Sequence, residues 1–163
     1  MEKYFIVSPK ADLYKDYFKY IENRKAVHEH VKRFFDKHEI KAQYYDCLGN
    51  WLYIKPTEED LKVFGSMLCQ AELNGLRCFK ENSKIGRAWA KSLQETNLKV
   101  LSKPQILLYL DHYIPRCRYR LFRVGTVLYG SIETDSEFTL PEGFEEIKAS
   151  EFYQKLEEIE AKK

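Results

Sequence analysis

The sequence predicts an α+β fold: a mixed, mainly antiparallel sheet with three to four helices packed on it, in a single domain over residues 1–163. Three observations predict this class. One long stretch has helical periodicity, two pairs of β-rich runs flank short turns that contain glycine, and strands do not alternate strictly with helices. The chain is 44% hydrophobic and 15% aromatic, which supplies enough apolar side chains for one core.

The first half of the chain begins with a short strand and a long helix. Residues 4–7 form an apolar β-type run that ends at Ser8–Pro9. Asp12 is a good N-cap, and apolar residues then recur every three or four positions over residues 13–38, while charged residues fill most of the other face. We expect this long helix to lie across a sheet.

A hairpin and a second helix are expected next. The β-rich runs 43–48 and 51–55 flank Gly49–Asn50, where glycine supplies the positive φ of a type II′ turn. The segment Thr57–Asp60 resembles a capping box, with three carboxylates at the positive end of a helix dipole. We expect the helix that follows to end at Asn74–Gly75.

The middle of the chain predicts a third helix. Residues 76–79 fit a short strand, and Asn82 or Ser83 can cap a helix that ends near Gln94. The apolar residues at helical spacing are Ile85, Trp89 and Leu93. Residues 97–115 fit either a helix or a strand.

The last part of the chain predicts a second hairpin and a terminal helix. Residues 116–124 and 126–134 are rich in aromatic and β-branched side chains and meet near a glycine. Residues 138–144 read as a loop with proline and glycine. Ser150 is expected to cap a helix that runs to about Glu160 and packs on or near the domain.

The net charge of +2 conceals a strong segregation along the chain. Residues 1–73 carry 12 basic and 12 acidic groups, and residues 74–132 carry 11 basic and 3 acidic groups. The C-terminal segment 133–163 carries 4 basic and 10 acidic groups. This asymmetry is the most informative feature of the sequence, because a concentrated basic stretch indicates an anion-binding surface.

Two groups of basic side chains share a face within the basic stretch. On the third helix, at about 100° per residue, one group falls within about 60° of arc and comprises Lys84, Arg87 and Lys91. Alternate residues of the following strand project from one sheet face, and these are Arg116, Arg118 and Arg120. Arginine grips a carboxylate or phosphate through two parallel hydrogen bonds. These six residues are the candidate anion- or partner-binding residues.

The hypothesis that follows is a non-enzymatic, cytosolic binding or inhibitory protein. It would engage an acidic partner through the basic surface of residues 80–123. The partner is an acidic protein face, a nucleic acid or a phosphorylated small molecule, and the sequence does not choose among them. The opposing interpretation is ordinary surface, with the arginines neutralised by C-terminal carboxylates, chiefly Glu142, Glu145, Glu146, Glu157 and Glu158.

Two other classes of function stay open. A small hydrolase or transferase would hold a phosphorylated substrate with the arginines and take its base from Asp111 or His112. A structural subunit would complete its apolar surface by self-association. The aromatic residues around the first hairpin also suit the stacking of single-stranded bases, although no RNP-type pattern is present; they are Tyr44, Tyr45, Trp51 and Tyr53.

No cofactor, metal or membrane segment is expected. The chain lacks a glycine-rich phosphate loop and the HExxH and GxSxG motifs, and His28 and His30 would point in different directions from one helix. No apolar run approaches the roughly 20 residues of a spanning helix, and the N-terminal apolar run is too short for a signal peptide. The cysteines are expected to be free thiols in a cytosolic protein: Cys47, Cys69, Cys78 and Cys117.

Overall fold

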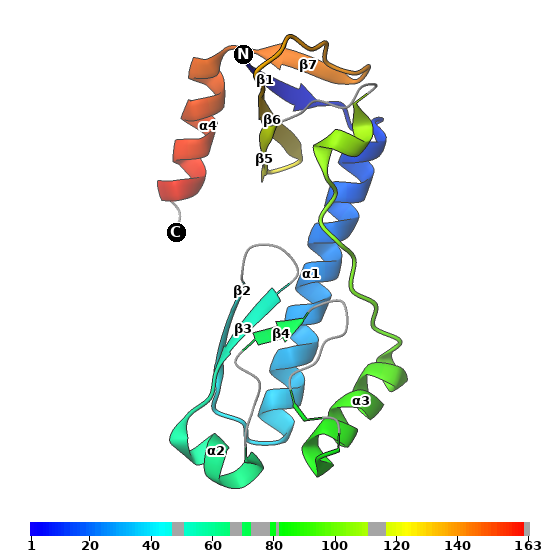
Figure 1. Ribbon diagram of the computed structural model, residues 1–163, viewed down its shortest axis with the longest axis vertical. Coiled ribbons are helices and arrows are strands. Elements are labelled where there is room, and N and C mark those ends of the chain that lie inside the picture. Colours follow the sequence, from blue (N-terminus) through cyan, green and yellow to red (C-terminus); the bar gives the residue numbers. More distant parts are fainter. Residues whose placement is uncertain (47–50, 66–69, 73–78, 81, 111–116, 162–163) are drawn as a thin grey trace. The chain divides into compact units, whose positions relative to one another are not determined.

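The computed structural model describes residues 1–46, 51–65, 70–72, 79–80, 82–110 and 117–161. Its four α-helices and antiparallel strands confirm the α+β fold class (Figure 1). The chain divides into two compact units: unit 1 comprises residues 1–18 and 104–163, and unit 2 comprises residues 19–103. The boundary falls inside α1 (Asp12–Lys37), the long helix predicted from the periodicity. A single domain over the whole chain stays a prediction.

Unit 1 contains a four-stranded antiparallel sheet with the order β5-β6-β1-β7. Its strands are β1 (Glu2–Val7), β5 (Arg118–Val124), β6 (Val127–Glu133) and β7 (Phe144–Ile147). The predicted β5–β6 hairpin is confirmed, and Gly125 adopts a φ of 60° at its turn. The edge strand β7 was not predicted, because its four residues include two adjacent glutamates and only pairing with β1 makes them a strand.

Different aromatic side chains are buried on the two faces of this sheet. Phe5 and Val7 are buried on one face, where the Phe5 ring lies so close to Gly130 that a Cβ there would be 2.5 Å from it. On the other face, Phe152 of α4 (Ala149–Ala161) packs on Tyr4 and Phe122, with ring centroids 4.9 and 5.2 Å apart. Since α4 begins at Ala149, the prediction of Ser150 as its N-cap is wrong.

The segment before β5 docks on the first turns of α1. The sequence of residues 97–115 fitted either a helix or a strand. Within this range the structure has a short 3₁₀ helix, η1 (Ile106–Tyr109). The Tyr109 hydroxyl donates a hydrogen bond to the Asp16 carboxylate. The Tyr14 hydroxyl donates to the Thr126 carbonyl oxygen at 2.6 Å, so the helix is also tied to the β5–β6 turn.

Unit 2 contains a three-stranded antiparallel sheet with the order β2-β3-β4. Its strands are β2 (Gln43–Asp46), β3 (Trp51–Lys55) and β4 (Gln70–Glu72). The predicted pairing of β2 with β3 is confirmed, whereas the predicted turn at Gly49–Asn50 lies outside the described residues.

The second helix is capped as predicted but is much shorter. The Thr57 hydroxyl accepts from the Asp60 amide at 3.2 Å, and the Asp60 carboxylate accepts from the Thr57 amide at 2.9 Å. The helix α2 (Glu58–Phe64) then ends at Gly65, whose φ of 74° departs from helical geometry. The expected end at Asn74–Gly75 is therefore wrong, because residues 70–72 pair with β3 instead.

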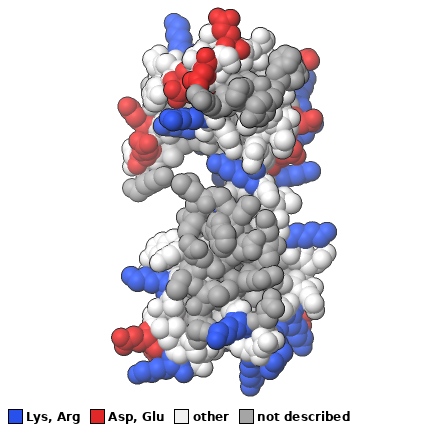
Figure 2. Space-filling model, in the orientation of Figure 1, with Lys and Arg blue, Asp and Glu red and all other residues white. Residues whose placement is uncertain are grey.

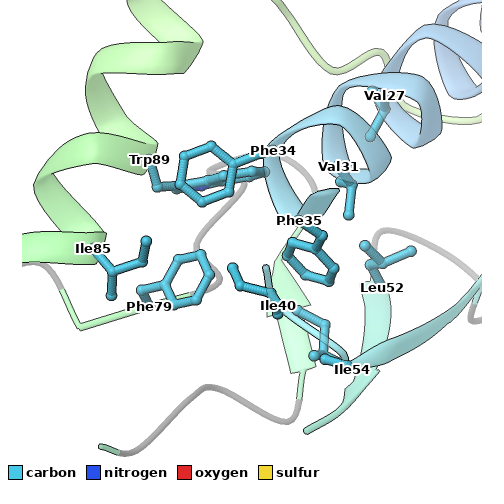
Figure 3. Packing of buried hydrophobic residues seen from close by; sticks show 11 residues of the cluster. Val27, Val31, Phe34, Phe35, Ile40, Leu52, Ile54, Phe79, Ile85 and Trp89 are labelled. Atoms are coloured by element: carbon cyan, nitrogen blue, oxygen red, sulfur yellow. The ribbon is translucent and has the colours of Figure 1, made fainter. Parts of the chain in front are cut away.

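The core of unit 2 joins α1 and α3 (Lys84–Thr96) to the sheet. Ser83 caps α3, accepting from the Gly86 amide at 3.0 Å, and Trp89 meets Phe34 edge-on with ring centroids 4.8 Å apart. Figure 3 shows this pair with the other labelled residues of the same buried cluster: Val27, Val31, Phe35, Ile40, Leu52, Ile54, Phe79 and Ile85. Only Phe79 of the predicted strand 76–79 is described, and it is buried here.

Within the described residues, no helix combines the length and the apolar character needed to cross a membrane.

Candidate functional site

The structure places the two predicted basic groups in different units. Lys84, Arg87 and Lys91 are exposed on α3 in unit 2, opposite the buried face of that helix. Arg118 and Arg120 are exposed on β5 in unit 1, and Arg116 lies outside the described residues. Each group is therefore assessed within its own unit.

The arginines of β5 face a partly acidic neighbourhood. Arg118 lies opposite Glu133 of β6, which in turn lies opposite Glu2 of β1, while Arg120 lies opposite Ser131. Side chains directly opposite on antiparallel strands have Cβ atoms about 5 Å apart. Neither arginine forms an ion pair with a carboxylate of the described residues, so the expected neutralisation by the C-terminal glutamates is not observed there.

The basic face of α3 is only weakly engaged within the unit. The Arg87 guanidinium donates to the Asn82 carbonyl oxygen at 3.0 Å. The Lys91 ammonium lies 3.9 Å from the Glu95 carboxylate one turn later, and both side chains are well exposed. An exposed pair of this kind is worth at most about 0.5 kcal/mol, so Lys91 stays available to another anion.

Lys91 also lines a groove of about 360 Å³ between α1 and α3. The helix α1 contributes Arg33 and Lys37, and α3 contributes Lys91 and Glu95. Among the described residues that line the groove, Glu95 is the only carboxylate. Figure 2 shows Lys and Arg side chains gathered at the end of unit 2 that holds α3. The groove therefore brings together three cations from two helices.

The contribution of α1 to this site was not predicted from the sequence. Arg33 and Lys37 are one helical turn apart and share a face, which is a weak signal that was available. They belong to a stretch with no net charge, and only the packing of Phe34 on Trp89 brings their face next to Lys91. Neither Arg33 nor Lys37 forms an ion pair with a carboxylate in the described part of the chain.

Two histidines in the groove are held neutral. Burial lowers the pKa of His30 and of His38 below the ordinary value, and the neighbouring charges of Arg33 and Lys37 lower the two pKa values further. The lower pKa values favour the neutral form of both imidazoles. A neutral imidazole still offers one N–H donor to a bound anion or to a protein group.

The contact between His30 and Ser92 resembles a nucleophile and its base. The His30 Nε2 atom lies 3.1 Å from the Ser92 Oγ atom. However, the Ser92 hydroxyl donates its only proton to the Trp89 carbonyl oxygen at 2.7 Å, so the hydrogen bond with His30 has the imidazole as its donor. The serine is thus not activated as a nucleophile in this arrangement.

Of the other candidate catalytic groups named from the sequence, only Cys117 lies within the described residues. Cys117 is a free thiol whose pKa is raised by burial, so it is not an activated nucleophile. The remaining cysteines and the proposed base at Asp111 or His112 lie outside the described residues. No group of three or more metal-ligating side chains occurs in the part of the chain that the structure describes.

The aromatic residues of the first hairpin divide between the core and the surface. Tyr44 points inward, and its ring meets that of Phe35 at 5.8 Å. Tyr45 and Tyr53 lie directly opposite each other and are 51% and 42% exposed. The side chain of Trp51 is outside the described part of the structure. Tyr44 therefore does not join Tyr45 and Tyr53 on an exposed surface, and the base-stacking interpretation stays a prediction for the other residues.

Comparison of the chain with protein-family models, with curated proteins and with solved structures finds no match. The interpretation of the groove therefore depends on its own residues.

Proposed function

We propose that the protein is a non-enzymatic binding protein that engages an anionic partner through the groove between α1 and α3. The observation that carries the proposal is the convergence of Arg33, Lys37 and Lys91 on a groove in which Glu95 is the only described carboxylate. Like charges that face one another across a groove repel, and a bound anion removes that repulsion.

The charge of the whole unit supports the same site. Unit 2 carries 16 basic and 11 acidic residues, a net charge of +5, whereas unit 1 carries 11 basic and 14 acidic residues, a net charge of −3. The field around unit 2 therefore attracts anions, and the groove concentrates it. Its volume falls within the range of small-molecule sites, so it can enclose a phosphate or a few carboxylates.

A binding role is favoured over a hydrolase because the groove holds no activated nucleophile among its described residues. The serine beside His30 donates its proton to a backbone carbonyl oxygen. Lys84 and Arg87 extend the same basic surface along α3, outside the groove. A cytosolic setting is part of the proposal.

The test is an NMR titration of the whole chain with inorganic triphosphate at low salt. We expect saturable shifts of the backbone amides of Arg33, Lys37 and Lys91. Reversal of one groove charge, in Arg33→Glu or Lys91→Glu, should weaken binding about tenfold, because each side chain contributes a charge-assisted hydrogen bond of about 1.4 kcal/mol. Added salt should weaken it further.

Matched controls separate the groove from general attraction. Lys32→Glu makes the same charge change one residue from Arg33, on an exposed side chain that does not line the groove. Arg120→Glu makes it in unit 1. The groove is not the site if either control weakens binding as much as Arg33→Glu does. A larger loss in Arg87→Glu than in Lys91→Glu would move the site to the outer face of α3.

A further inference from the structure

We propose that the groove recognises an acidic peptide segment that carries one large apolar side chain, rather than an isolated anion. The inference rests on the proposed function and names the class of ligand. It is carried by a second hollow that adjoins the groove and has different chemistry.

The second hollow has a volume of about 430 Å³ and is mainly apolar. The helix α2 contributes Val63 and Phe64, and α3 contributes Ile85 and Ala88 together with one cation, Lys84. Val63 is 68% exposed, so an apolar side chain that contacted it would remove a considerable apolar area from water. The hollow is large enough for a leucine or phenylalanine side chain.

The basic groove and the apolar hollow are continuous. His38 of α1 and Ala88 of α3 line both of them. One ligand can therefore place an anionic group beside Lys91 and an apolar group beside Val63. Such a ligand is amphipathic, with its anionic group at one end and its apolar group at the other.

The charges on the far side of the hollow fix the direction of the ligand. A third hollow shares His38, Val63 and Phe64 with the apolar one and is lined by carboxylates. Two of its four carboxylates have partners, whereas Asp36 and Glu39 form no ion pair among the described residues. Glu59 pairs with the Lys41 ammonium at 2.6 Å, and Asp60 accepts from the amides of Lys41 and Thr57. An anionic group is repelled from this side and attracted to the groove.

The helix geometry sets the spacing within the ligand. Ile85 and Lys91 are six residues apart on α3, which is about 9 Å at a rise of 1.5 Å per residue. An extended peptide advances about 3.3 Å per residue. The acidic and apolar side chains of an extended segment should therefore be about three positions apart.

Among the polar groups that line the hollow, which also include His38 and Lys84, Ser83 favours an apolar side chain over a nucleobase. The Ser83 hydroxyl, which lines the hollow, donates to the Lys80 carbonyl oxygen at 2.6 Å and accepts from the Gly86 amide at 3.0 Å. It is thus engaged in capping α3. The polar edge of a base would lose its hydrogen bonds to water there, whereas a leucine side chain has none to lose.

The experiment compares two labelled peptides by fluorescence anisotropy with the whole chain. One is Glu-Glu-Glu-Ala-Ala-Leu, and the other replaces the leucine with glycine. We expect the leucine peptide to bind about tenfold more tightly. Val63→Ser should remove most of that difference and leave the affinity of the glycine peptide unchanged. Leu61→Ser is the control, since Leu61 is exposed on the same helix but does not line the hollow.

The outcomes separate this inference from the proposed function. Equal affinities of the two peptides, with Lys91→Glu weakening both, would overturn the amphipathic ligand and keep the anion-binding groove. Tighter binding of a short oligothymidylate than of either peptide, insensitive to Val63→Ser, would overturn the peptide class. If neither peptide nor triphosphate shifts the groove amides, both proposals fail.

Discussion

Unit 1 and unit 2 each pack part of α1 against an antiparallel sheet, but their basic side chains face different surroundings. In unit 1, Arg118 lies opposite Glu133 within the sheet, and the unit is acidic. In unit 2, Arg33 and Lys37 lie across a groove from Lys91, and the unit is basic. For this reason the proposed anion site is the groove, where packing brings scattered cations together, rather than the row of arginines along β5.

The two units also differ in how the side chains of their cores pack. In unit 1, the Phe5 ring depends on the absence of a side chain at Gly130. In unit 2, Trp89 fills the space between α1 and α3 and packs against Phe34 and Phe79. The groove between these helices therefore depends on the aromatic core beneath it. Substitutions in each core test whether the units respond separately.

The largest effect is expected from Trp89→Ala in unit 2. Removing the buried indole should destabilise the protein by about 3–5 kcal/mol, because it leaves a cavity between α1 and α3. Hydrogen exchange should show greater loss of protection in β3 and α3 than in β1 and β6. Equal loss in both sheets would instead show that the units unfold together, which would support the single domain expected from the chain length.

Gly130→Ala is the reciprocal change in unit 1. The added methyl group would meet the Phe5 ring at 2.5 Å and force it to move, at a cost of about 1–3 kcal/mol. Denaturant unfolding measures the cost, and hydrogen exchange should place it in β1, β5 and β6. Anion binding by the groove should be unchanged. A loss of triphosphate affinity in this variant would contradict the independence of the two units.

Thr57→Ala should have a smaller effect, confined to unit 2. Loss of the hydroxyl leaves the Asp60 amide without its capping acceptor and costs about 1 kcal/mol. Thr57→Ser keeps the acceptor and is the control. The denaturant midpoint should fall in the alanine variant alone, and a similar fall in both would show that the methyl group of Thr57 matters instead.

The smallest effect expected is a pH dependence of the groove. The pKa values of His30 and His38 are lowered in the folded protein, so their contribution to stability is complete above the unfolded pKa and is lost as the pH falls through the folded pKa values. A bound anion favours the imidazolium and raises both pKa values. The charged groups that line the groove with both histidines are Arg33, Lys37, Lys91 and Glu95. His38 also lines the two neighbouring hollows, whose charged groups are Asp36, Glu39, Lys41, Glu59, Asp60 and Lys84.

Affinity for the tri-glutamate peptides should therefore increase by a few fold as the pH falls from about 7 to about 5.5, where glutamates stay largely ionised. The measurement is the affinity at each pH, together with NMR titration of the two imidazoles with and without peptide. Constant affinity over this range would show that the anion does not approach the histidines. The β5 arginines of unit 1 have no histidine beside them in the described residues, so no such pH dependence is expected there.

Much of the local structure could be predicted because it depends on neighbours in the chain. The capping box at Thr57, the cap at Ser83 and the hairpin at Gly125 each need only a few consecutive residues. The local prediction of an N-cap at Ser150 was wrong, and two larger errors occurred where distant residues decided the outcome. Residues 70–72 continue a helical pattern but pair with β3, and β7 lacks a strand pattern but pairs with β1.

The same distinction between neighbouring and distant residues applies to the candidate site. The sequence by itself determined that this is an α+β chain with segregated charge and that Lys84, Arg87 and Lys91 share one face of α3. Only the tertiary structure decided that Arg33 and Lys37 join Lys91 and that Arg118 and Arg120 belong to another unit. The physical reason is that helical periodicity fixes which side chains share a face, whereas the packing of Phe34 on Trp89 fixes which faces meet.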